Sequence, residues 1–552
     1  MLFAPLERSS DRQGTPNESL PPHSPEHPMA LSLNFITDAI AAQMPAVDPH
    51  RPAVALGGEA ALSWLDLRAT ELRYARALQQ AGVRKGDRVG LLLRNSTDYV
   101  ALYLAIGRVG AIAVRLNWRL TAPELQFALN DSDPGVLVLD AEFAALVAAI
   151  RDGVTVGTYV VRGEPGALDG ATPLSVFAAE ESDATGFPVV SPEDPVSLMY
   201  SSGTTGRPKG ALFSHGNALW IGSIQAQRWR IDSSTVCQTS GPLFHAGGFE
   251  VLLLPALITH GTAIAFPSGS FTLENFLRVG DQHNATDMLL YPFMLFELLR
   301  SGEDITHLVP QTLRRIVTGG DIVMPWVYDE LDNRLPGVEL VQSYSLTEGG
   351  AVSTSLEFDV ARGHESSIGT PQAMTEIKVI RPDGSPTDID EVGEICVRSG
   401  GVSIGYWNRP EDNRATFVDG WCHSGDLGRV DADGFLTIAG RAKDMYRSGG
   451  ENVYPAEIEM VLTGHADIAD AAVIGVADER YVEVGAALIV AAQGSAIDVA
   501  ELRSWLGERL AKYKVPKHFY FVDELPRNAN GKVLKNVLRD TYGQTTTTET
   551  NP

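Results

Sequence analysis

The chain has 552 residues, of which 44% are hydrophobic and 20% charged, a composition typical of globular proteins. This length exceeds what one compact core can bury, so two or more domains are expected. With 69 acidic against 44 basic residues the formal net charge is −25, which argues against binding to nucleic acid, because that needs a basic face.

Neither the cysteines nor the apolar segments indicate an extracellular or membrane-spanning protein. Cys237, Cys396 and Cys422 lie far apart without a C-x-x-C pair, so they offer neither a disulfide framework nor a zinc site and fit a reducing cytoplasm. Apolar runs such as residues 251–258 are far shorter than the ~20 residues of a membrane helix.

Both ends of the chain are predicted to lack a fixed structure. Residues 1–28 are rich in Pro, Ser and His and contain no apolar stretch like that of a secretory signal, so we interpret them as a disordered extension. The sequence leaves open whether Met29 is the natural start. Residues 542–552 are rich in threonine and are predicted to form a second disordered tail.

Strand and helix patterns alternate after the N-terminal extension. Ser63 and Asp66 have the spacing of a capping box, which predicts the start of a helix that ends near Gln80. The next elements are predicted to be strand 87–93, helix 97–108 and strand 110–114. This βαβ order predicts a mostly parallel sheet covered by helices.

A short predicted strand, residues 196–200, leads into the loop Tyr200-Ser-Ser-Gly-Thr-Thr-Gly-Arg-Pro-Lys-Gly-Ala211. Small residues let backbone N–H groups turn inward and Lys209 adds a positive charge, so the loop suits a phosphate. It differs from the standard G-x-x-x-x-G-K-[ST] loop, because its glycines are too close and a glycine follows the lysine. Such clusters also form plain surface turns, so composition alone leaves both readings open. The preceding strand favours a ligand site.

The sequence changes character in its last quarter. Residues 438–454 interrupt the alternation with charges and glycines. The elements beyond them are predicted to be strand 471–476, strand 485–491, helix 498–510 and strand 518–522. We therefore place a domain boundary near Arg441, which predicts an N-terminal domain of residues 29–440 and a C-terminal domain of residues 441–541.

Further motifs follow the loop in a fixed order along the chain. They are Pro-Leu-Phe-His-Ala-Gly-Gly at 242–248, Thr-Gly-Gly-Asp at 318–321, Gln-Ser-Tyr-Ser-Leu-Thr-Glu at 342–348, Ser-Gly-Asp-Leu at 424–427, the run 440–455, and Asn-Ala-Asn-Gly-Lys at 528–532. Each alone has an ordinary explanation: His245 as a structural histidine, Asp426 as the cap of a turn, Lys532 as a solvated charge. All of them together, in this order, are far more specific than any one motif alone.

Together these motifs resemble the adenylate-forming superfamily of acyl- and aryl-CoA synthetases, carrier-protein adenylation domains and luciferases. The resemblance covers residues 30–540 and is closest to bacterial fatty-acid and aromatic-acid CoA ligases. It implies an α/β fold, with a large N-terminal domain of mixed, mostly parallel sheets covered by helices and a small, mobile α+β C-terminal domain. It also implies an ATP-dependent, AMP-forming acid–CoA ligase that uses Mg²⁺ and coenzyme A.

The implied reaction explains why cations and fixed donors are needed. A carboxylate is a poor electrophile, and coupling it to AMP gives an acyl-adenylate with a good leaving group. The enzyme must bring two anions together, which requires positive charge and preorganised donors. By resemblance, the β- and γ-phosphates are contacted by Ser201, Ser202, Gly203, Thr204, Thr205 and Lys209.

The resemblance implies four catalytic residues. Thr347 contacts the α-phosphate, and Glu348 holds Mg²⁺, a cation that prefers oxygen ligands. Lys532 bridges the carboxylate of the acid and the α-phosphate, and thereby neutralises charge as the new bond forms. His245 completes the set.

The rest of the nucleotide is implied to lie against three further motifs. Tyr344 stacks on adenine, and Asp426 accepts hydrogen bonds from the ribose hydroxyls with Arg441 beside it. The adenine edge is lined by Gly319, Gly320, Asp321, Gln342 and Ser343.

The acid and coenzyme A are implied to approach through the later part of the chain. The acyl pocket is lined by Phe244, His245, Phe293, Ser345, Gly349 and Gly350, of which Phe244 and His245 gate the thiol entrance. Lys443 is the hinge about which the small domain rotates between the two half-reactions. The rotated domain brings Gly449, Gly450 and Asn452 to the pantetheine arm.

Three positions depart from the family pattern. Ser345 stands where a glycine usually forms a wall of the pocket, Phe293 where a threonine is common, and Asp321 where an alanine or glutamate is common. The first two predict a short pocket, and hence a small to medium acid that is aromatic or of short to medium chain length.

Alternative functions remain open on the sequence. The acyl group could pass to a carrier protein, the activated acid could be nitrite in a diazotase-type reaction, or the fold could serve as a catalytically idle binding protein. The intact loop, Glu348 and Lys532 argue against the last. The expected partners are the acid, ATP and coenzyme A in the cytoplasm, and a homodimer is left open.

Overall fold

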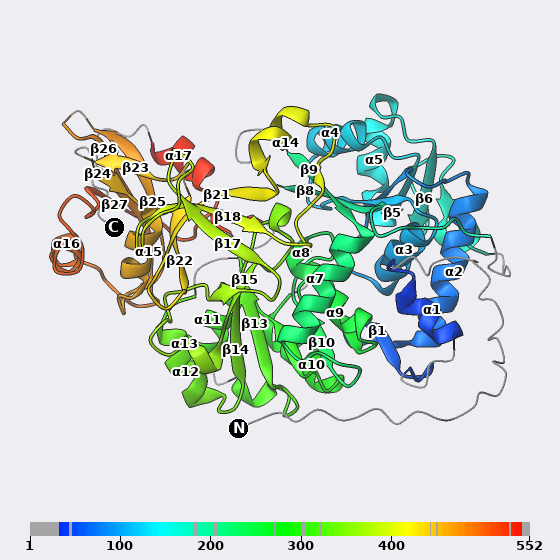
Figure 1. Ribbon diagram of the computed structural model, residues 1–552, viewed down its shortest axis with the longest axis horizontal. Helices are drawn as coiled ribbons and strands as arrows, with labels where there is room; N and C mark the ends of the chain where they lie inside the picture. Colours follow the sequence, from blue (N-terminus) through cyan, green and yellow to red (C-terminus); the bar gives the residue numbers. More distant parts are fainter. Residues whose placement is uncertain are drawn as a thin grey trace, which may run out of the picture. The chain divides into compact units, whose positions relative to one another are not determined.

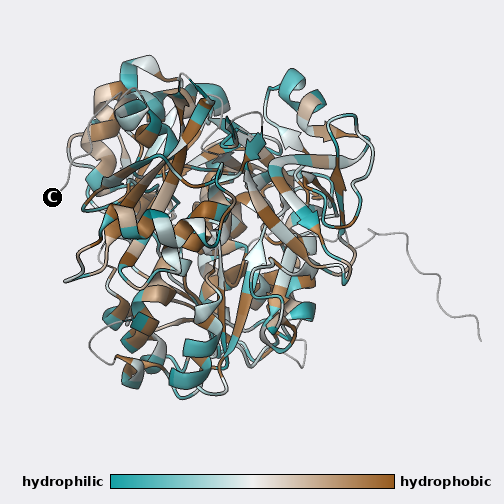
Figure 2. Cartoon of the chain, turned by 90° about the vertical axis from the view of Figure 1, so that its left-hand side faces the viewer, coloured by the Kyte–Doolittle hydropathy of each residue, from teal (hydrophilic) through white to brown (hydrophobic). Residues whose placement is uncertain are grey.

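The computed structural model describes residues 32–42, 47–179, 186–201, 208–269, 271–300, 305–320, 323–441, 443–448, 451–478, 480–528 and 532–543. These residues form four β-sheets with helices packed around and between them (Figure 1). Figure 2 shows that hydrophobic residues are frequent along the strands, whereas the helices mix hydrophobic and hydrophilic residues.

The first sheet has nine strands in the order β16-β15-β14-β13-β12-β10-β11-β1-β2. The strands from β14 to β1 run parallel, and β2, β15 and β16 pair antiparallel at the edges. The strands are β1 (Pro52–Leu56), β2 (Leu62–Ser63), β10 (Val236–Thr239), β11 (Thr262–Ala265), β12 (Asp287–Leu289), β13 (Arg315–Gly319), β14 (Glu339–Tyr344), β15 (Thr354–Glu357) and β16 (Thr370–Pro371).

The second sheet has eight strands in the order β19-β9-β8-β4-β3-β5-β6-β7. It is parallel from β8 to β7, while β9 pairs antiparallel with both β8 and β19. The strands are β3 (Arg88–Leu92), β4 (Ile112–Arg115), β5 (Val136–Asp140), β6 (Thr158–Arg162), β7 (Thr172–Pro173), β8 (Pro195–Ser201), β9 (Lys209–Ser214) and β19 (Gly405–Tyr406).

A shared hydrophobic core joins these two sheets. It contains Val54 and Ala263 of the first sheet and Val89 and Ala113 of the second, together with helices that lie between them. The central helix α3 (Thr97–Arg108) is buried at every position from Tyr99 onward, as expected for a helix that is apolar on all sides. The other helices of this core are α1 (Phe35–Ala41), α2 (Trp64–Gln80), α6 (Leu174–Phe177), α7 (His215–Arg228), α8 (Ala246–Phe249) and α9 (Leu253–Ile258).

The remaining helices of this part cover the outer faces of the two sheets or join their strands. They are α4 (Ala122–Ser132), α5 (Ala144–Ile150), α10 (Leu273–Gln282), α11 (Pro292–Arg300), α12 (Trp326–Arg334), α13 (Phe358–Ala361) and α14 (Pro410–Thr416). None of the described helices is both long enough and apolar enough to cross a bilayer.

The third sheet is antiparallel, in the order β17-β18-β21-β20 with β22 paired to β21. The strands are β17 (Glu376–Ile380), β18 (Gly393–Arg398), β20 (Phe417–Val418), β21 (Trp421–Val430) and β22 (Leu436–Arg441). This sheet places Asp426 and Arg441 directly opposite each other.

The fourth sheet belongs to the C-terminal region and has its own core. Its strands are β23 (Tyr446–Ser448), β24 (Glu451–Val453), β25 (Ile468–Asp478), β26 (Val482–Ala491) and β27 (His518–Phe521), with helices α15 (Pro455–Thr463), α16 (Val499–Gly507) and α17 (Lys535–Tyr542). Two hydrophobic clusters in this region are made entirely of its own buried residues, from Tyr446 to Leu538. The boundary near Arg441 stays a prediction.

Several sequence predictions are confirmed. Helix α2 begins with the predicted capping box, in which the backbone N–H of Asp66 donates to Ser63 Oγ at 3.1 Å. The predicted βαβ unit is β3, α3 and β4, and the strand before the glycine-rich loop is β8. Helix α16 ends at Gly507, three residues earlier than predicted, and the segment 438–454 contains the short strands β23 and β24 rather than an interruption alone.

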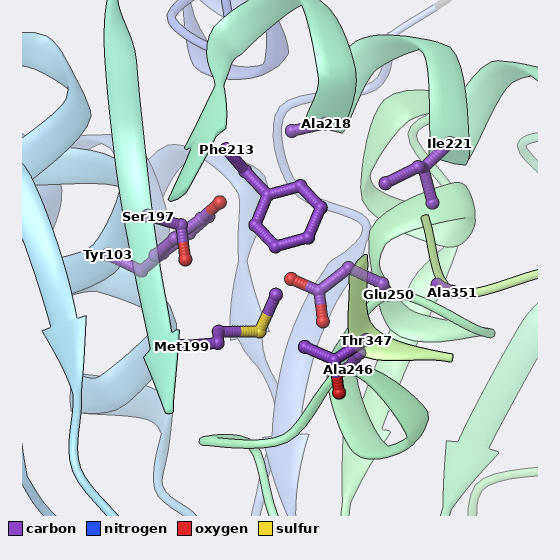
Figure 3. Close-up of a pocket in the computed structure, with 10 residues that line it drawn as sticks. All are labelled: Tyr103, Ser197, Met199, Phe213, Ala218, Ile221, Ala246, Glu250, Thr347 and Ala351. Atoms are coloured by element: carbon purple, nitrogen blue, oxygen red, sulfur yellow. The ribbon is translucent and has the colours of Figure 1, made fainter. Parts of the chain in front are cut away.

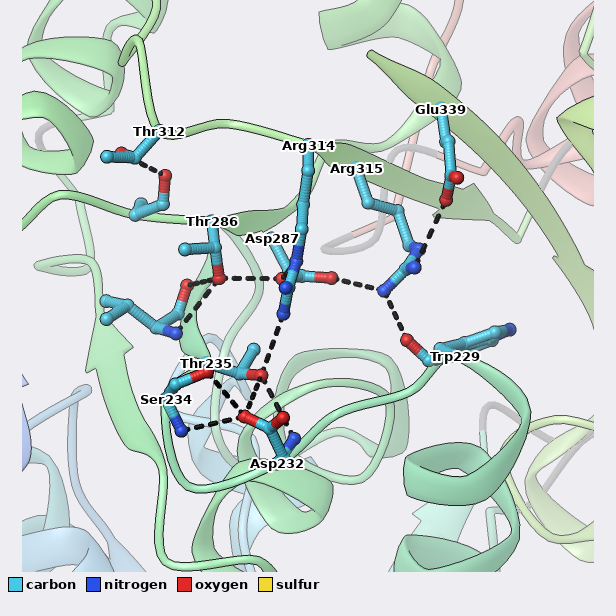
Figure 4. A network of polar contacts seen from close by, with 12 residues as sticks. Trp229, Asp232, Ser234, Thr235, Thr286, Asp287, Thr312, Arg314, Arg315 and Glu339 are labelled. Carbon is cyan, nitrogen blue, oxygen red and sulfur yellow. Dashed lines mark hydrogen bonds and ion pairs between the residues drawn. The ribbon is translucent and has the colours of Figure 1, made fainter. Parts of the chain in front are cut away.

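A buried polar network fixes the amino ends of β12 and β13 (Figure 4). Asp287 is fully buried, and its carboxylate accepts from Arg315 at 2.5 Å and from Arg314 at 3.2 Å. Arg315 also donates to the carbonyl of Trp229 at 2.6 Å and pairs with the exposed Glu339 at 3.1 Å. Because the strands are parallel, this network lies at the end of the sheet opposite to Gly319 and Tyr344.

Candidate active site

The predicted nucleotide motifs meet at the carboxyl ends of β13 and β14, the edge at which open α/β sheets bind ligands. The two strands pair in parallel, with Gly319 opposite Ser343. Ser343 Oγ donates to the carbonyl of Thr318 at 3.0 Å, and a Cβ on Gly319 would lie 2.4 Å from the carbonyl oxygen of Ser343. Gly320 has φ +87°, a conformation that favours glycine. Close packing at Gly319 and the backbone conformation at Gly320 therefore both favour glycine at this edge.

Tyr344, Asp426 and Arg441 form one hydrogen-bonded group. The Tyr344 hydroxyl donates to Asp426 Oδ2 at 2.9 Å, and Arg441 Nε lies 2.9 Å from Asp426 Oδ1. Burial, and then the Asp426 charge, raise the pKa of Tyr344 far above its ordinary value, so the phenol stays a neutral donor. Both oxygens of the carboxylate are thus oriented. The neighbouring Gln342 side chain accepts from Tyr328 at 3.2 Å.

A second group links the glycine-rich loop to Glu348. Glu348 is buried in the 3₁₀ turn η4 (Thr347–Gly349), and Tyr406 donates its hydroxyl to Glu348 Oε1 at 2.8 Å. The ring of the same tyrosine faces Lys209 Nζ at 5.2 Å, and Lys209 pairs with Asp412. Burial, and then the Glu348 charge, raise the pKa of Tyr406, so it too stays protonated.

The sequence analysis missed Tyr406 and Asp412. Both belong to residues 405–416, which lie in none of the motifs. Tyr406 is in β19, which pairs with β9, and Asp412 follows in α14. The donor type of Glu348, a buried carboxylate oxygen, fits Mg²⁺.

Some predicted site residues lie outside the described residues. They are Ser202, Gly203, Thr204 and Thr205 of the phosphate loop, together with Asp321, Gly449 and Gly450, and Ser201 is described only in its backbone.

His245 is held in place by its own loop and by a buried ion pair behind it. Its Nδ1 accepts from the backbone N–H of Gly247 at 3.1 Å. Arg115 is fully buried, pairs with Glu250, and donates to the carbonyl of Leu243 in the same loop. Burial, assisted by the Arg115 charge, lowers the pKa of His245 to about 4, so the imidazole is neutral at pH 7. Phe244, the other predicted gate residue, is buried.

A small cavity adjoins this loop and Thr347 (Figure 3). Its volume is about 10 Å³, close to what one water molecule needs. It is lined by Tyr103, Ser197, Met199, Phe213, Ala218, Ile221, Ala246, Glu250, Thr347 and Ala351. The hydroxyls of Tyr103 and Ser197 are buried without a hydrogen-bond partner among the described residues, so the cavity has polar groups to offer.

The predicted wall of the acyl pocket contains a fixed hydroxyl. Ser345 Oγ lies 2.8 Å from Ser353 Oγ and 3.1 Å from the carbonyl of Leu346. A Cβ on Gly350 would lie 2.3 Å from the carbonyl oxygen of Gly401, so no side chain fits there. Gly349 is buried in the same turn.

Phe293 and Tyr291 stack with ring centroids 6.4 Å apart, and they differ in exposure. Phe293 is 40% exposed, whereas Tyr291 is buried. A Cβ on Gly241 or Gly247 would lie 2.7 or 3.1 Å from the Tyr291 hydroxyl, so Tyr291 is the residue that contacts the histidine loop. The role of Phe293 in the pocket stays a prediction.

The predicted residues of the C-terminal region lie in separate segments, two in turns or loops and one in a strand. Lys443 lies in the turn that the backbone N–H of Asp444 closes by donating to the carbonyl of Arg441 at 2.9 Å. Partial desolvation of its ammonium group lowers the pKa of Lys443. Asn452 lies in β24 and accepts from Arg447 at 3.3 Å. Lys532 is half-buried, and its backbone N–H donates to Asn528 Oδ1 at 2.9 Å, which closes its loop.

Comparisons with known proteins agree along nearly the whole chain. The AMP-binding enzyme family matches residues 41–407, and the AMP-binding enzyme C-terminal domain matches residues 457–532. Feruloyl-CoA synthase of Amycolatopsis sp is 38% identical over 90% of this chain and 97% of its own length. Indoleacetate–CoA ligase of Aromatoleum aromaticum is 36% identical over 88% of this chain and 94% of its own length.

The solved structures give the same result for the fold. The anthranilate CoA ligase AuaEII in complex with anthranoyl-AMP matches with a TM-score of 0.85 and 26% identity, over 93% of this chain and 98% of that chain. The predicted α/β fold, with a large N-terminal and a smaller C-terminal domain, is thereby confirmed. The chain belongs to the AMP-binding family of adenylate-forming enzymes and is an ATP-dependent acid–CoA ligase that uses Mg²⁺ and coenzyme A.

Proposed function

We propose that this ligase activates an aromatic carboxylic acid of small to medium size. The observation that carries the proposal is the position of Ser345, two residues before Thr347. Its hydroxyl is held by hydrogen bonds to Ser353 and to the carbonyl of Leu346. It narrows the predicted acyl pocket where the family usually has a glycine. The three relatives named above act, by their names, on feruloyl, indoleacetate and anthranilate groups, all of which are flat and ring-bearing.

In the first half-reaction the acid carboxylate attacks the α-phosphate of ATP and pyrophosphate leaves. We assign Lys209 to the departing phosphates, Glu348 to the magnesium ion and Thr347 to the α-phosphate. Bound Mg²⁺ supplies charge neutralisation on the phosphates. We assign Asp426, whose two oxygens are oriented by Tyr344 and Arg441, to accept hydrogen bonds from the ribose hydroxyls.

In the second half-reaction the thiol of coenzyme A attacks the acyl carbon and AMP leaves. We assign Gly449, Gly450 and Asn452 to the pantetheine arm and the neutral His245 to the thiol entrance. A neutral imidazole adds no charge to the path of an incoming thiol. Rotation of the C-terminal domain about Lys443 would switch between the two half-reactions.

The test is a panel of acids assayed for pyrophosphate release with and without coenzyme A. We expect benzoate-, cinnamate- and arylacetate-type acids to release the most pyrophosphate and to form thioesters only when coenzyme A is present. Adenylation without transfer to coenzyme A would point to a carrier protein as acceptor, and AMP formation from nitrite plus an arylamine to the diazotase-type reaction. Preference for hexadecanoate would contradict the proposal.

Ser345→Gly is expected to shift the preference of the enzyme toward longer acids. A pocket gains ~0.8 kcal/mol for each buried CH₂ while room lasts, and overpacking costs ~1–3 kcal/mol beyond that point. In a straight-chain series, kcat/KM of the wild type should rise, peak early and fall, and the variant should peak at a longer chain. Ser353→Ala removes the partner hydroxyl without widening the wall and serves as the control. Unchanged profiles in both variants would contradict the role of Ser345.

Lys443→Pro is expected to separate the two half-reactions. Proline fixes φ near −65° and also restricts the residue before it, so the turn from Arg441 to Asp444 loses the freedom that a hinge needs. One half-reaction should continue while the other slows, measured as pyrophosphate exchange and as thioester formation from supplied acyl-adenylate. Lys443→Ala removes the same side chain but keeps the backbone free, and should lose far less. Normal turnover of the proline variant would argue against the rotation.

We place the enzyme in the cytoplasm, in keeping with three cysteines that are all unpaired and buried. A homodimer is the oligomeric state we propose, and size-exclusion chromatography with light scattering tests it.

A further inference from the structure

Three potential metal ligands meet on one face of the third sheet, next to the motif at residues 424–427. They are Glu394 and Cys396 of β18 and His423 of β21, and one ligand atom of each lies within 4.8 Å of the other two. Cys396 pairs directly with His423 across the antiparallel strands, and residues two apart on a strand share a face, so the backbone itself brings the three together.

The three side chains offer the atoms that a thiophilic divalent ion prefers. Zinc binds thiolate, imidazole and carboxylate at 2.0–2.3 Å in tetrahedral sites, in which ligand atoms lie on the order of 3.5 Å apart. The side chains would have to close by about 1 Å, which rotation about their χ angles allows. Glu394 and His423 are 31% and 22% exposed, so an ion can enter from solvent, while the buried Cys396 forms the floor.

The surroundings already hold two of the three groups in contact. His423 Nδ1 already lies 2.9 Å from Glu394 Oε2, so two of the three groups are held together. Lys378, which pairs with Cys396 from β17, has its ammonium 4.4 Å from the Trp421 ring centroid, where cation–π attraction holds it. On binding, the Cys396 thiol would release its proton to solvent as the sulfur–metal bond forms.

Strand β21, which carries His423, also carries Asp426, the carboxylate assigned above to the ribose. Glu394 Oε1 accepts from the backbone N–H of Gly425 at 3.1 Å, and Ser424 Oγ accepts from the N–H of Asp426 at 3.0 Å. A metal ion bound by Glu394 and His423 would therefore act on the two residues that precede and follow Ser424, and so on the segment that leads to Asp426.

We propose that Glu394, Cys396 and His423 form an accessory site for a thiophilic divalent cation of the zinc class, and that its occupation weakens nucleotide binding. The site itself is independent of the proposed acid. Only its effect rests on the proposed role of Asp426, which contacts Tyr344 and Arg441.

The first test is cobalt titration of the purified full chain, because a thiolate bound to Co²⁺ gives a charge-transfer band in the near ultraviolet. We expect the band in the wild type, saturating at one cobalt per chain and abolished by Zn²⁺. It should disappear in Cys396→Ser and Cys396→Ala, and apparent affinity should fall roughly 10-fold or more in His423→Asn. Cys422→Ser is the matched control, since Cys422 is also buried but pairs with Val397 on the other face, and it should keep the band.

The second test measures ATP binding in the presence of Mg²⁺ with and without micromolar Zn²⁺. We expect Zn²⁺ to weaken ATP binding in the wild type and in Cys422→Ser, a chelator to restore it, and both Cys396 variants to be insensitive. Thermal unfolding checks that each variant is folded. Absence of the band in the wild type, or its persistence in both Cys396 variants, would overturn the site. A band without an effect on ATP would overturn the coupling and leave the site, and neither result depends on which acid is the substrate.

Discussion

Lys532→Ala is expected to slow acyl-adenylate formation by roughly 10²–10³-fold, the usual cost of removing one preorganised charge contact from a transition state. Formation of the thioester from supplied acyl-adenylate should stay close to wild type, because the charge that Lys532 neutralises develops only in the first half-reaction. Pyrophosphate exchange measures the first step, and thioester formation from synthetic acyl-adenylate measures the second.

Lys535→Ala is the matched control for this experiment. Lys535 lies three residues further on, at the start of α17, and its ammonium pairs with Glu459 at 2.6 Å, so its removal takes one positive charge from the same segment without touching the proposed contact. It should leave pyrophosphate exchange nearly unchanged. If Lys532→Ala lost both half-reactions equally, its assignment to the adenylation step would be wrong.

Asp287→Ala is expected to lower the free energy of unfolding by about 3–5 kcal/mol, because it removes the buried carboxylate that pairs with the buried Arg315. The network lies at the opposite end of the sheet from the nucleotide motifs, so KM for ATP should hardly change below the unfolding temperature. Chemical denaturation and initial rates measure the two quantities.

Glu339→Gln tests the same arginine from its solvent side. Glu339 pairs with Arg315 at 3.1 Å, but its side chain is 58% exposed, so the loss should be at most about 1 kcal/mol. Equal losses in the two variants would mean that burial does not decide the strength of this network.

Local patterns predicted the elements whose formation depends on neighbouring residues. The Ser63–Asp66 capping box started α2 as expected, and the βαβ rhythm correctly gave β3, α3 and β4, because short-range hydrogen bonds and apolar periodicity decide these elements. Two of the family motifs lie at the carboxyl ends of the neighbouring parallel strands β13 and β14, which is why residues near 319 and 344 meet.

Contacts between distant segments could not be read from the sequence. Tyr406 reaches Glu348 across 58 residues and Asp412 reaches Lys209 across 203, and no local pattern records either pairing. The cysteine spacing likewise gave no sign of the Glu394, Cys396 and His423 group, because the ligands come from two strands that the fold sets side by side.

Tyr406 connects Glu348, the carboxylate that we propose for magnesium, with Lys209, the lysine that we propose for the departing phosphates. Its hydroxyl is bonded to Glu348 and its ring lies against Lys209, so a ligand that draws Glu348 away changes the support of the ammonium. Linkage is reciprocal: whatever factor magnesium applies to the affinity for the departing phosphates, those phosphates apply to the affinity for magnesium. In the roles that we propose for Glu348 and Lys209, one aromatic side chain therefore couples the binding of magnesium to that of the departing phosphates.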